Sequence, residues 1–315
     1  METKQIIIKD WLRHLARINM PVYQYESDNM KIAYAGYSPI KRVYYARLLL
    51  NKDYRVTFLG RHWYSRLPHL IDSSNIDMIV SELSPNTFSH FQNCNGFILP
   101  VWAAIRVNID RPVCEIFNGR VTRMNYKNTM RCLRNHNLTY ELLKDEESFR
   151  YFKERFYHPY MNKRHGEEAF IEDLNIMWKS CDQPLLMAIK ENGCTIGMLF
   201  FKKSKEVLYL MRLGLLDGNE AYLNHGVIGA MYYFGILEGQ KMGCKSVDMG
   251  GTRPFLTDGL TKYKVGWGGE FVPDLAPDKE YLWFGVNHRS TIAKEFLNSN
   301  PFMHINKEFR LVKYE

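Results

Sequence analysis

The stretch VDMGGTRPFLTDGLTKYKVGWGGEF, residues 247–271, places six glycines, an Arg-Pro pair and a tryptophan within 25 positions. Val247 ends a β-like run, and Gly250 and Gly251 permit positive φ or a close approach that a side chain would block. Asp258, together with Thr257, is a candidate cap for a short helix. That helix would carry Leu260, Tyr263, Lys264 and Trp267. A strand, a bare loop, an aromatic helix and a second strand are typical of one wall of a site.

Length and composition place the chain among globular proteins. Its 315 residues are about two domains' worth, with 46% hydrophobic and 24% charged residues. No long apolar run predicts a membrane span, and the first residues lack the features of a signal peptide. Six cysteines without a CxxC pair indicate reduced thiols, so we expect a cytoplasmic protein. No metal-ligand spacing occurs, and no metal is expected.

The positive charge is concentrated in the first part of the chain. Residues 1–135 hold 19 lysines and arginines against 10 aspartates and glutamates, whereas residues 136–315 hold 23 against 24. A helix predicted over residues 122–137, with Thr122 as its N-cap, carries a basic stripe on one face. The stripe consists of Arg123, Lys127, Arg131 and Arg134. It is either a solvated helix face or a surface for a polyanion such as tRNA.

The order of elements favours a mixed α/β protein. Residues 1–121 alternate strand-like and helix-like segments, including PVYQYE, IDMIVSEL and AAIRVNI. From residue 138 the pattern is β-α-α-β-β-β-α-β-α-β-β, and it ends with the strand EYLWFGV. We therefore expect an N-terminal domain over 1–121, a basic linker helix over 122–137 and a C-terminal domain over 138–315.

This order resembles the GNAT acyltransferase fold. The motif VDMGGTRPFLTDGLTKYKVGWG looks like its FemAB-like branch, in which a strand ending in Asp-x-Gly-Gly leads to a lysine-containing short helix. The segments FYHPYMNKRHGEEAF and NHGVIGAMYYFGILEG are similar to the same branch. The resemblance covers about 180 residues. It implies two tandem GNAT-like halves, the first degenerate, with strands Met211–Leu215 and Val247–Gly250 parallel and diverging at one end.

The resemblance also implies where an acyl donor would bind. The donor lies where the two parallel strands separate, beside the N-terminus of the following helix, with backbone N–H groups available to polarise its carbonyl. The residues that correspond are Leu213, Gly214 and Leu215, followed by Asn224, His225 and Gly226. The chain departs from acetyl-CoA enzymes here, because LNHGVIGA does not match the glycine-rich pyrophosphate cradle. Gly226 and Gly229 serve either the donor or close helix packing against the sheet.

Catalytic residues are expected on the short helix. Tyr263 lies where many GNAT enzymes place the tyrosine that protonates the leaving group, and its alternative is a core aromatic. Lys264 matches the lysine of the FemAB-like motif, which can contact a phosphate or a carboxylate. Asp258 acts either as a base or as a helix cap.

Acceptor-binding residues are expected on both sides of the groove. Arg164 and His165 lie between the first two helices of the C-terminal domain, and Arg253 projects from the loop before Pro254. Asp248 either points into the cleft or ends its strand.

The sequence thus predicts an N-acyltransferase without a tightly bound cofactor, acting on an amine of a cell-envelope or surface-glycan precursor. The envelope substrate comes from the resemblance alone, as does possible peripheral contact with a membrane. Two co-substrates compete. An aminoacyl-tRNA fits the absent cradle and the basic stripe, and acyl-CoA fits the general fold. A further alternative is a non-catalytic RNA- or glycan-binding protein on a decayed transferase fold.

Overall fold

The structure, a computed structural model, describes residues 19–50, 53–84, 87–166, 173–273 and 280–314. The chain divides into two compact units that exchange segments. Unit 1 comprises Met1–Ala103, Arg253–Thr261 and Pro273–Glu315, and unit 2 comprises Ala104–Thr252 and Lys262–Val272. The domain boundaries expected at residues 121 and 138 do not coincide with this division, because strands from both ends of the chain enter the other part's sheet.

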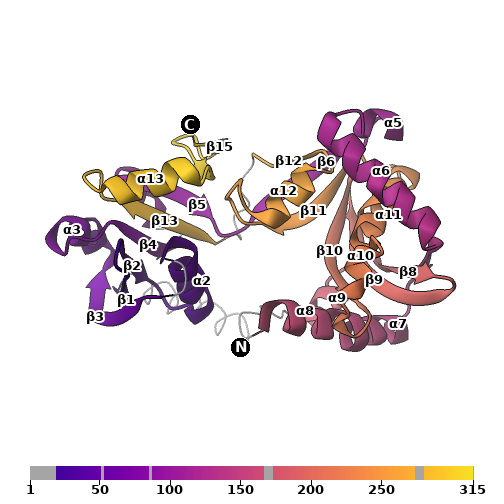
Figure 1. Cartoon of the computed structure of the whole chain (residues 1–315), viewed down its shortest axis with the longest axis horizontal. Coiled ribbons are helices and arrows are strands. Elements are labelled where there is room, and N and C mark those ends of the chain that lie inside the picture. The colour runs from indigo at the N-terminus through magenta and orange to yellow at the C-terminus, as the bar shows by residue number, and fades with distance from the viewer. Residues whose placement is uncertain (1–18, 51–52, 85–86, 167–172, 274–279, 315) are drawn as a thin grey trace, which may run out of the picture. The chain divides into compact units, whose positions relative to one another are not determined.

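Unit 1 is built on an eight-stranded mixed sheet in the order β15-β14-β5-β13-β4-β2-β1-β3 (Figure 1). Its strands are β1 (Asn19–Glu26), β2 (Lys31–Ala35), β3 (Arg55–Trp63), β4 (Met78–Leu83), β5 (Gly96–Pro100), β13 (Tyr281–Val286), β14 (Met303–Ile305) and β15 (Leu311–Lys313). Strands β2 and β4 are parallel, and the other strand pairs described in this sheet are antiparallel. The segments PVYQYE and MKIAYAG pair as neighbouring strands.

The helices of unit 1 pack their apolar residues against this sheet. They are α2 (Pro39–Leu50), a 3-10 turn (Tyr64–Arg66), α3 (Leu67–Ser73), α4 (Phe88–Gln92) and α13 (Thr291–Ser299). Tyr45 and Leu49 of α2 and Ala293 and Leu297 of α13 join Phe284 of β13 in one buried cluster. The spacing of three and four residues on the helices is what places these side chains on one face.

Unit 2 is built on a seven-stranded sheet in the order β12-β6-β11-β10-β9-β8-β7. Its strands are β6 (Ala103–Asn108), β7 (Leu138–Leu143), β8 (Pro184–Glu191), β9 (Cys194–Ser204), β10 (Val207–Leu215), β11 (Ser246–Thr252) and β12 (Gly269–Phe271). Strands β10 and β11 form a parallel pair, whereas the pairs β12–β6, β10–β9, β7–β8 and β8–β9 are antiparallel. Strands β8 and β9 are joined by a turn at Asn192-Gly193, where both residues have positive φ.

Helices cover both faces of this second sheet. They are α5 (Val113–Ile116), α6 (Arg120–Asn135), α7 (Glu146–Tyr151), a π-helix (Phe152–Tyr157), α8 (His158–His165), α9 (Leu174–Lys179), a 3-10 turn (Leu216–Gly218), α10 (Ala221–Asn224), α11 (Val227–Lys241) and α12 (Gly259–Val265). Along β8, Leu185 and Met187 join the core beneath α11, while Leu186 and Ala188 join the core beneath α7 and α9. This alternation buries both faces of the strand.

Three expectations about the elements are wrong. EYLWFGV, expected as the last strand of the C-terminal sheet, is β13 of unit 1, and AAIRVNI, expected in the first part, is β6 of unit 2. The basic helix is no linker, because α6 packs within unit 2 against α11. It begins at Arg120 with Gly119 as N-cap, and the Thr122 hydroxyl donates to the Gly119 carbonyl. A periodic pattern fixes which face is buried but not which partner buries it.

The segment NHGVIGAMYYFGILEG is not one continuous helix. The chain divides into α10 and α11 at Gly226, which has a φ of 78°. None of the helices in the described residues is both long and apolar enough to cross a membrane.

Candidate functional site

The parallel strands β10 and β11 diverge, as predicted. They pair at Val207↔Ser246, Leu208↔Val247 and Tyr209↔Asp248, and the ladder stops there although β10 continues to Leu215. The register of β10 with β9 also shifts between Leu210 and Arg212, which is the mark of a β-bulge. Of the last six residues of β10, all except Met211 have a ladder partner in β9, and none has a partner in β11.

The N-terminus of α11 lies at the divergent end of β10. A Cβ on Gly197, which pairs with Leu215, would lie 2.5 Å from Cγ1 of Val227 at the start of the helix. At the other end, a Cβ on Gly239 would lie 3.2 Å from Val247, where the ladder is intact. The helix thus runs antiparallel to β10, and its partial positive charge points toward the open end of the strand pair.

Helix α6 covers that helix N-terminus. A Cβ on Gly226 would lie 2.6 Å from Cβ of Cys132, and one on Gly229 would lie 2.6 Å from Oγ1 of Thr129. Both glycines therefore allow close helix packing, with α6 and not the sheet as the partner. Of the other residues predicted here, Asn224 is exposed.

Lys264 brings a buried positive charge to the end of β11. Its side chain is 3% exposed, and its Nζ donates to the carbonyl oxygens of Gly250 at 3.1 Å and Gly251 at 2.8 Å. Gly250 has a φ of 78°, and a Cβ there would lie 3.3 Å from the Leu210 carbonyl oxygen. Lys264 thus holds the strand end in place at the divergence. Its predicted contact with a donor phosphate or carboxylate stays a prediction.

Tyr263 lies on α12 among aromatic rings. Its ring centroid is 5.7 Å from that of Tyr232 on α11 and 6.5 Å from that of Trp267. The side chain is half-buried, and this burial raises the pKa of the phenol above 10. A phenol carries its proton at neutral pH and can therefore act as a proton donor. The catalytic role stays a prediction.

Asp258 caps α12. Its Oδ1 accepts from the backbone N–H of Thr261 at 2.9 Å and from the Thr261 hydroxyl at 3.2 Å. This is the capping alternative that the sequence offered. With one carboxylate oxygen held in this way, the role as a base stays a prediction.

Asp248 is paired with an arginine that the sequence did not single out. Its Oδ2 accepts from Nε of Arg106 on β6 at 3.0 Å, and its Oδ1 accepts from the N–H of Gly250. Arg106 also donates to the Tyr209 hydroxyl at 3.3 Å. The three side chains meet at the last rung of the β10–β11 ladder, on the face opposite α11. Because 142 residues separate Arg106 from Asp248, no spacing in the sequence could have indicated the pair.

The remaining acceptor candidates belong to different units. Arg164, in unit 2, is exposed at the end of α8, with its guanidinium 5.8 Å from the Tyr160 ring centroid. The side chain of His165 lies outside the described residues. Arg253, in unit 1, is held between the rings of Tyr44 and Trp102, each 4.0 Å away. These two cation–π contacts restrict the position of the arginine side chain.

The backbone of a π-helix supports β10 from the face opposite α11. A Cβ on Gly214 would lie 2.5 Å from the carbonyl oxygen of Phe156, inside the π-helical segment. Gly214 was predicted to polarise a donor carbonyl, and the structure adds a reason for glycine at this place. π-helical turns are rare and are frequent at functional sites. Leu213 and Leu215, predicted with Gly214, lie on the same stretch of β10, which pairs with β9 and has no partner in β11.

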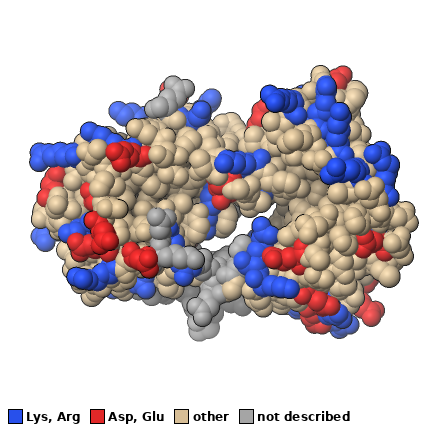
Figure 2. Space-filling view, viewed as in Figure 1, with Lys and Arg blue, Asp and Glu red and all other residues tan. Residues whose placement is uncertain are grey.

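The predicted basic stripe lies on the outer face of α6. The helix sequence contains no aspartate or glutamate, and Lys and Arg side chains gather along it (Figure 2). The exposed basic residues are Arg120, Arg123, Lys127, Arg131 and Arg134. Arg123 donates to the side chain of Asn118 at 2.8 Å. The inner face carries Thr129, which packs on α11 near the divergent end of β10 and β11, and the outer face is basic.

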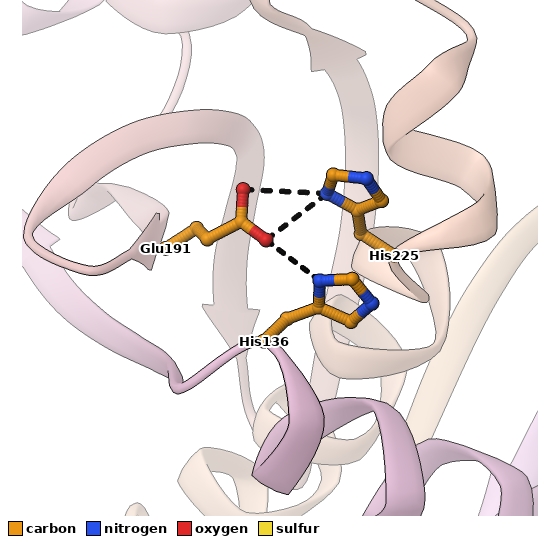
Figure 3. A group of neighbouring side chains, drawn as sticks. All are labelled: His136, Glu191 and His225. Atoms are coloured by element: carbon orange, nitrogen blue, oxygen red, sulfur yellow. Dashed lines mark hydrogen bonds and ion pairs between the residues drawn. The ribbon is translucent and has the colours of Figure 1, made fainter.

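Two further features were not expected from the sequence. His136, Glu191 and His225 form a cluster with ligand atoms within 4.8 Å of one another (Figure 3). The second feature is a pocket in unit 1 of about 290 Å³ beside the start of α2, with Arg42 and Arg61 in its lining. His225 was predicted to contact the donor, and its ring instead faces Glu191.

No protein-family model matches the chain, and a search of curated proteins finds no match. Among solved structures, the chain is similar to L-PGS from Bacillus licheniformis, with 9% sequence identity over 89% of this chain and 85% of that chain and a TM-score of 0.43. It is also similar to FemX, with 12% identity, 86% and 88% coverage and a TM-score of 0.43. A tandem GNAT protein from the clavulanic acid biosynthesis pathway has 7% identity, 73% and 74% coverage and a TM-score of 0.34.

Proposed function

We propose that the protein is an N-acyltransferase of the FemAB-like GNAT type, with its reaction centre in unit 2 where β10 and β11 diverge. The divergence is the observation that carries the proposal, because it leaves β10 with an edge that no strand occupies. The sequence motif around Tyr263 and Lys264 supports the same assignment. The acceptor is an amine of a cell-envelope or surface-glycan precursor, as the resemblance implies.

The chemistry follows from the groups at this edge. A donor ester carbonyl would accept hydrogen bonds from N–H groups between Leu213 and Leu215. Attack by the amine forms a C–N bond as the ester C–O bond breaks. The leaving ribose oxygen takes the proton of Tyr263, and the proton that the amine loses restores the phenol.

The cover that α6 provides supports an aminoacyl-tRNA as the donor. Gly226 and Gly229 pack closely against Cys132 and Thr129 of α6, and the sequence around them does not match the pyrophosphate cradle of acetyl-CoA enzymes. The opposite face of the same helix presents the basic stripe to a polyanion, and phosphate contacts supply much of the affinity for nucleic acids.

Salt-dependent binding tests the donor. We expect total tRNA to bind with an affinity whose logarithm falls with log salt by roughly 0.7–0.9 per phosphate contact. Lys127→Ala combined with Arg131→Ala should flatten this slope by about one to two units. The matched control is Lys144→Ala combined with Lys179→Ala, which removes two exposed lysines outside α6. It should leave the slope unchanged.

Filter binding of tRNA and isothermal titration of acetyl-CoA, each at two salt concentrations, separate the donors. Saturable acetyl-CoA binding without tRNA retention would overturn the tRNA donor. Equal slopes for the α6 variant and its control would remove the stripe from the donor site.

A further inference from the structure

His136, Glu191 and His225 form a cluster that the proposed reaction does not use. His136 follows the last residue of α6, Glu191 ends β8, and His225 follows α10 just before α11. Gaps of 55 and 34 residues separate Glu191 from the two histidines, yet Figure 3 shows the three side chains pointing toward one another. All three belong to unit 2.

Both imidazoles present the same kind of nitrogen to one carboxylate. Nδ1 of His136 is 2.8 Å from Oε1 of Glu191, and Nδ1 of His225 is 3.0 Å from Oε1 and 3.3 Å from Oε2. The two rings stack with centroids 4.2 Å apart and planes at 13°. The second nitrogen of each ring points away from Glu191 (Figure 3).

This donor set is the one that zinc takes in sites with three protein ligands. Two imidazole nitrogens and one carboxylate leave a fourth tetrahedral position for water or another ligand. Bonds of about 2.0–2.1 Å in a tetrahedron place neighbouring ligand atoms roughly 3.3 Å apart. The Nδ1–oxygen distances of 2.8–3.3 Å are near this value. The stacked rings are nearly parallel, so one imidazole has to turn before both Nδ1 lone pairs point at one ion.

The surroundings allow an ion to enter and to keep an open position. The side chains of His136, Glu191 and His225 are 31%, 19% and 30% exposed. They are partly withdrawn from water, which strengthens an ion–carboxylate contact, but none is sealed off. An ion held here would join the ends of α6, β8 and α10.

We propose that His136, Glu191 and His225 bind one zinc ion through two Nδ1 atoms and the carboxylate, with one coordination position open to solvent. The site is independent of the acyl transfer proposed above, since neither Tyr263 nor Lys264 takes part in it.

Zinc content and affinity test the site. In the full chain, with the exposed cysteines Cys114 and Cys194 replaced by serine to remove competing thiols, we expect about one zinc per chain after loading and dialysis. The double variant His136→Ala/His225→Ala should weaken zinc binding, measured by isothermal titration, by at least about a hundredfold. Loss of an outer-shell partner alone costs about 10–100-fold in such sites.

His69→Ala/His288→Ala is the matched control, because it removes two exposed histidines of unit 1 and should keep full zinc binding. Circular dichroism establishes folding of each variant. If the double variant does not fold, Glu191→Gln keeps the shape of the side chain and should lose affinity in the same way. A folded parent chain without bound zinc, or equal affinity in the parent chain and the cluster variants, would overturn the proposal.

Discussion

In the described residues, unit 1 contains the parallel pair β2–β4 with helix α2 starting beside it, and unit 2 contains the parallel pair β10–β11 with helix α11 starting beside it. The two pairs end differently. In unit 1, β2 and β4 stay paired up to Ala35↔Ser81, the last residue of β2. In unit 2, the β10–β11 ladder stops at Tyr209↔Asp248 with six residues of β10 still to come. The first pair is closed, and the second is open.

A buried carboxylate closes the pair in unit 1. Glu82, at 6% exposed, follows Ser81, the last residue of β4 that pairs with β2. Its Oε1 accepts from the Tyr34 hydroxyl at 2.7 Å and from the N–H of Ser38, just before α2, at 2.9 Å. The chain's own anion thus occupies the start of this helix, where an anionic ligand would otherwise be favoured.

The comparison shows two ways in which a parallel strand pair of this kind can end. In unit 2 no carboxylate from β11 reaches the start of α11 in the described residues, because Asp248 turns to Arg106 on the other face of the sheet. The edge of β10 that faces away from β9 has no partner in β11 beyond Tyr209, and Lys264 holds the carbonyls of Gly250 and Gly251 beside it. This difference supports the proposed placement of the reaction in unit 2.

The largest expected effect is a difference in turnover between two variants, each of which removes the hydroxyl of one tyrosine, one from each unit. Tyr263→Phe should lower turnover with an aminoacyl-tRNA and an amine acceptor by roughly 10²-fold or more, because it removes the proton donor for the leaving group. Tyr34→Phe removes the hydroxyl that donates to Glu82 in the closed pair and should change turnover by less than about twofold. Single-turnover assays on folded variants measure both. Equal losses in the two variants would refute the assignment of the chemistry to unit 2.

A smaller effect concerns the glycines that pack against each pair. Gly214→Ala would bring a Cβ to 2.5 Å from a backbone oxygen of Phe156 and should lower the free energy of unfolding by about 1–3 kcal/mol. Gly36→Ala meets the side chain of Glu82 at 2.6 Å, which can move more readily, so its cost should be lower.

Urea denaturation measures both glycine variants. Gly259→Ala, where no atom lies within 4 Å of the added Cβ, is the control and should not destabilise the chain. A larger cost for Gly36→Ala than for Gly214→Ala would contradict the packing argument.

The smallest effect is a pH dependence that arises in the closed pair. Burial, followed by the nearby Glu82 carboxylate, raises the pKa of Tyr34 well above 10. An unfolded tyrosine ionises near pH 10, so the unfolded chain releases a proton that folded Tyr34 retains. The contribution is complete below about pH 10 and is lost as pH rises above it.

Tyr34→Phe should therefore make the fall in stability above pH 10 shallower, by at most about 1.4 kcal/mol per pH unit. Urea denaturation from pH 9 to 11.5 measures this slope, with Tyr151→Phe, which removes an exposed phenol, as the control. Parallel slopes for the parent chain and Tyr34→Phe would show that this proton is not linked to folding.

Local patterns in the sequence predicted much of unit 2. Apolar runs in the sequence indicate strands β8, β9 and β10, and an Asn-Gly pair indicates the turn between β8 and β9. Asp145 is a residue type that caps helices, and its side chain accepts from the N–H of Ser148. The basic stripe of α6 was visible because helical spacing places its residues on one face. These features depend on residues near one another in the chain.

Features that depend on distant partners were missed. The Arg106–Asp248 pair and the cluster of His136, Glu191 and His225 join residues tens to more than a hundred positions apart. Tyr34 and Glu82 are separated by 48 residues, so the closure of the first strand pair was equally hidden. Hydrophobic periodicity identifies strands and faces, but it does not order the strands in a sheet.

The position of β13 has a consequence for synthesis of the chain on the ribosome. Strand β13, at residues 281–286, lies between β4 and β5 and pairs with both along its length, although those strands emerge almost 200 residues earlier. Until it emerges, β4 and β5 lack their common neighbour and keep unpaired edges, whereas unit 2 requires nothing beyond residue 272. The unit that begins first should therefore finish folding last, and its strands should depend most on chaperones during translation.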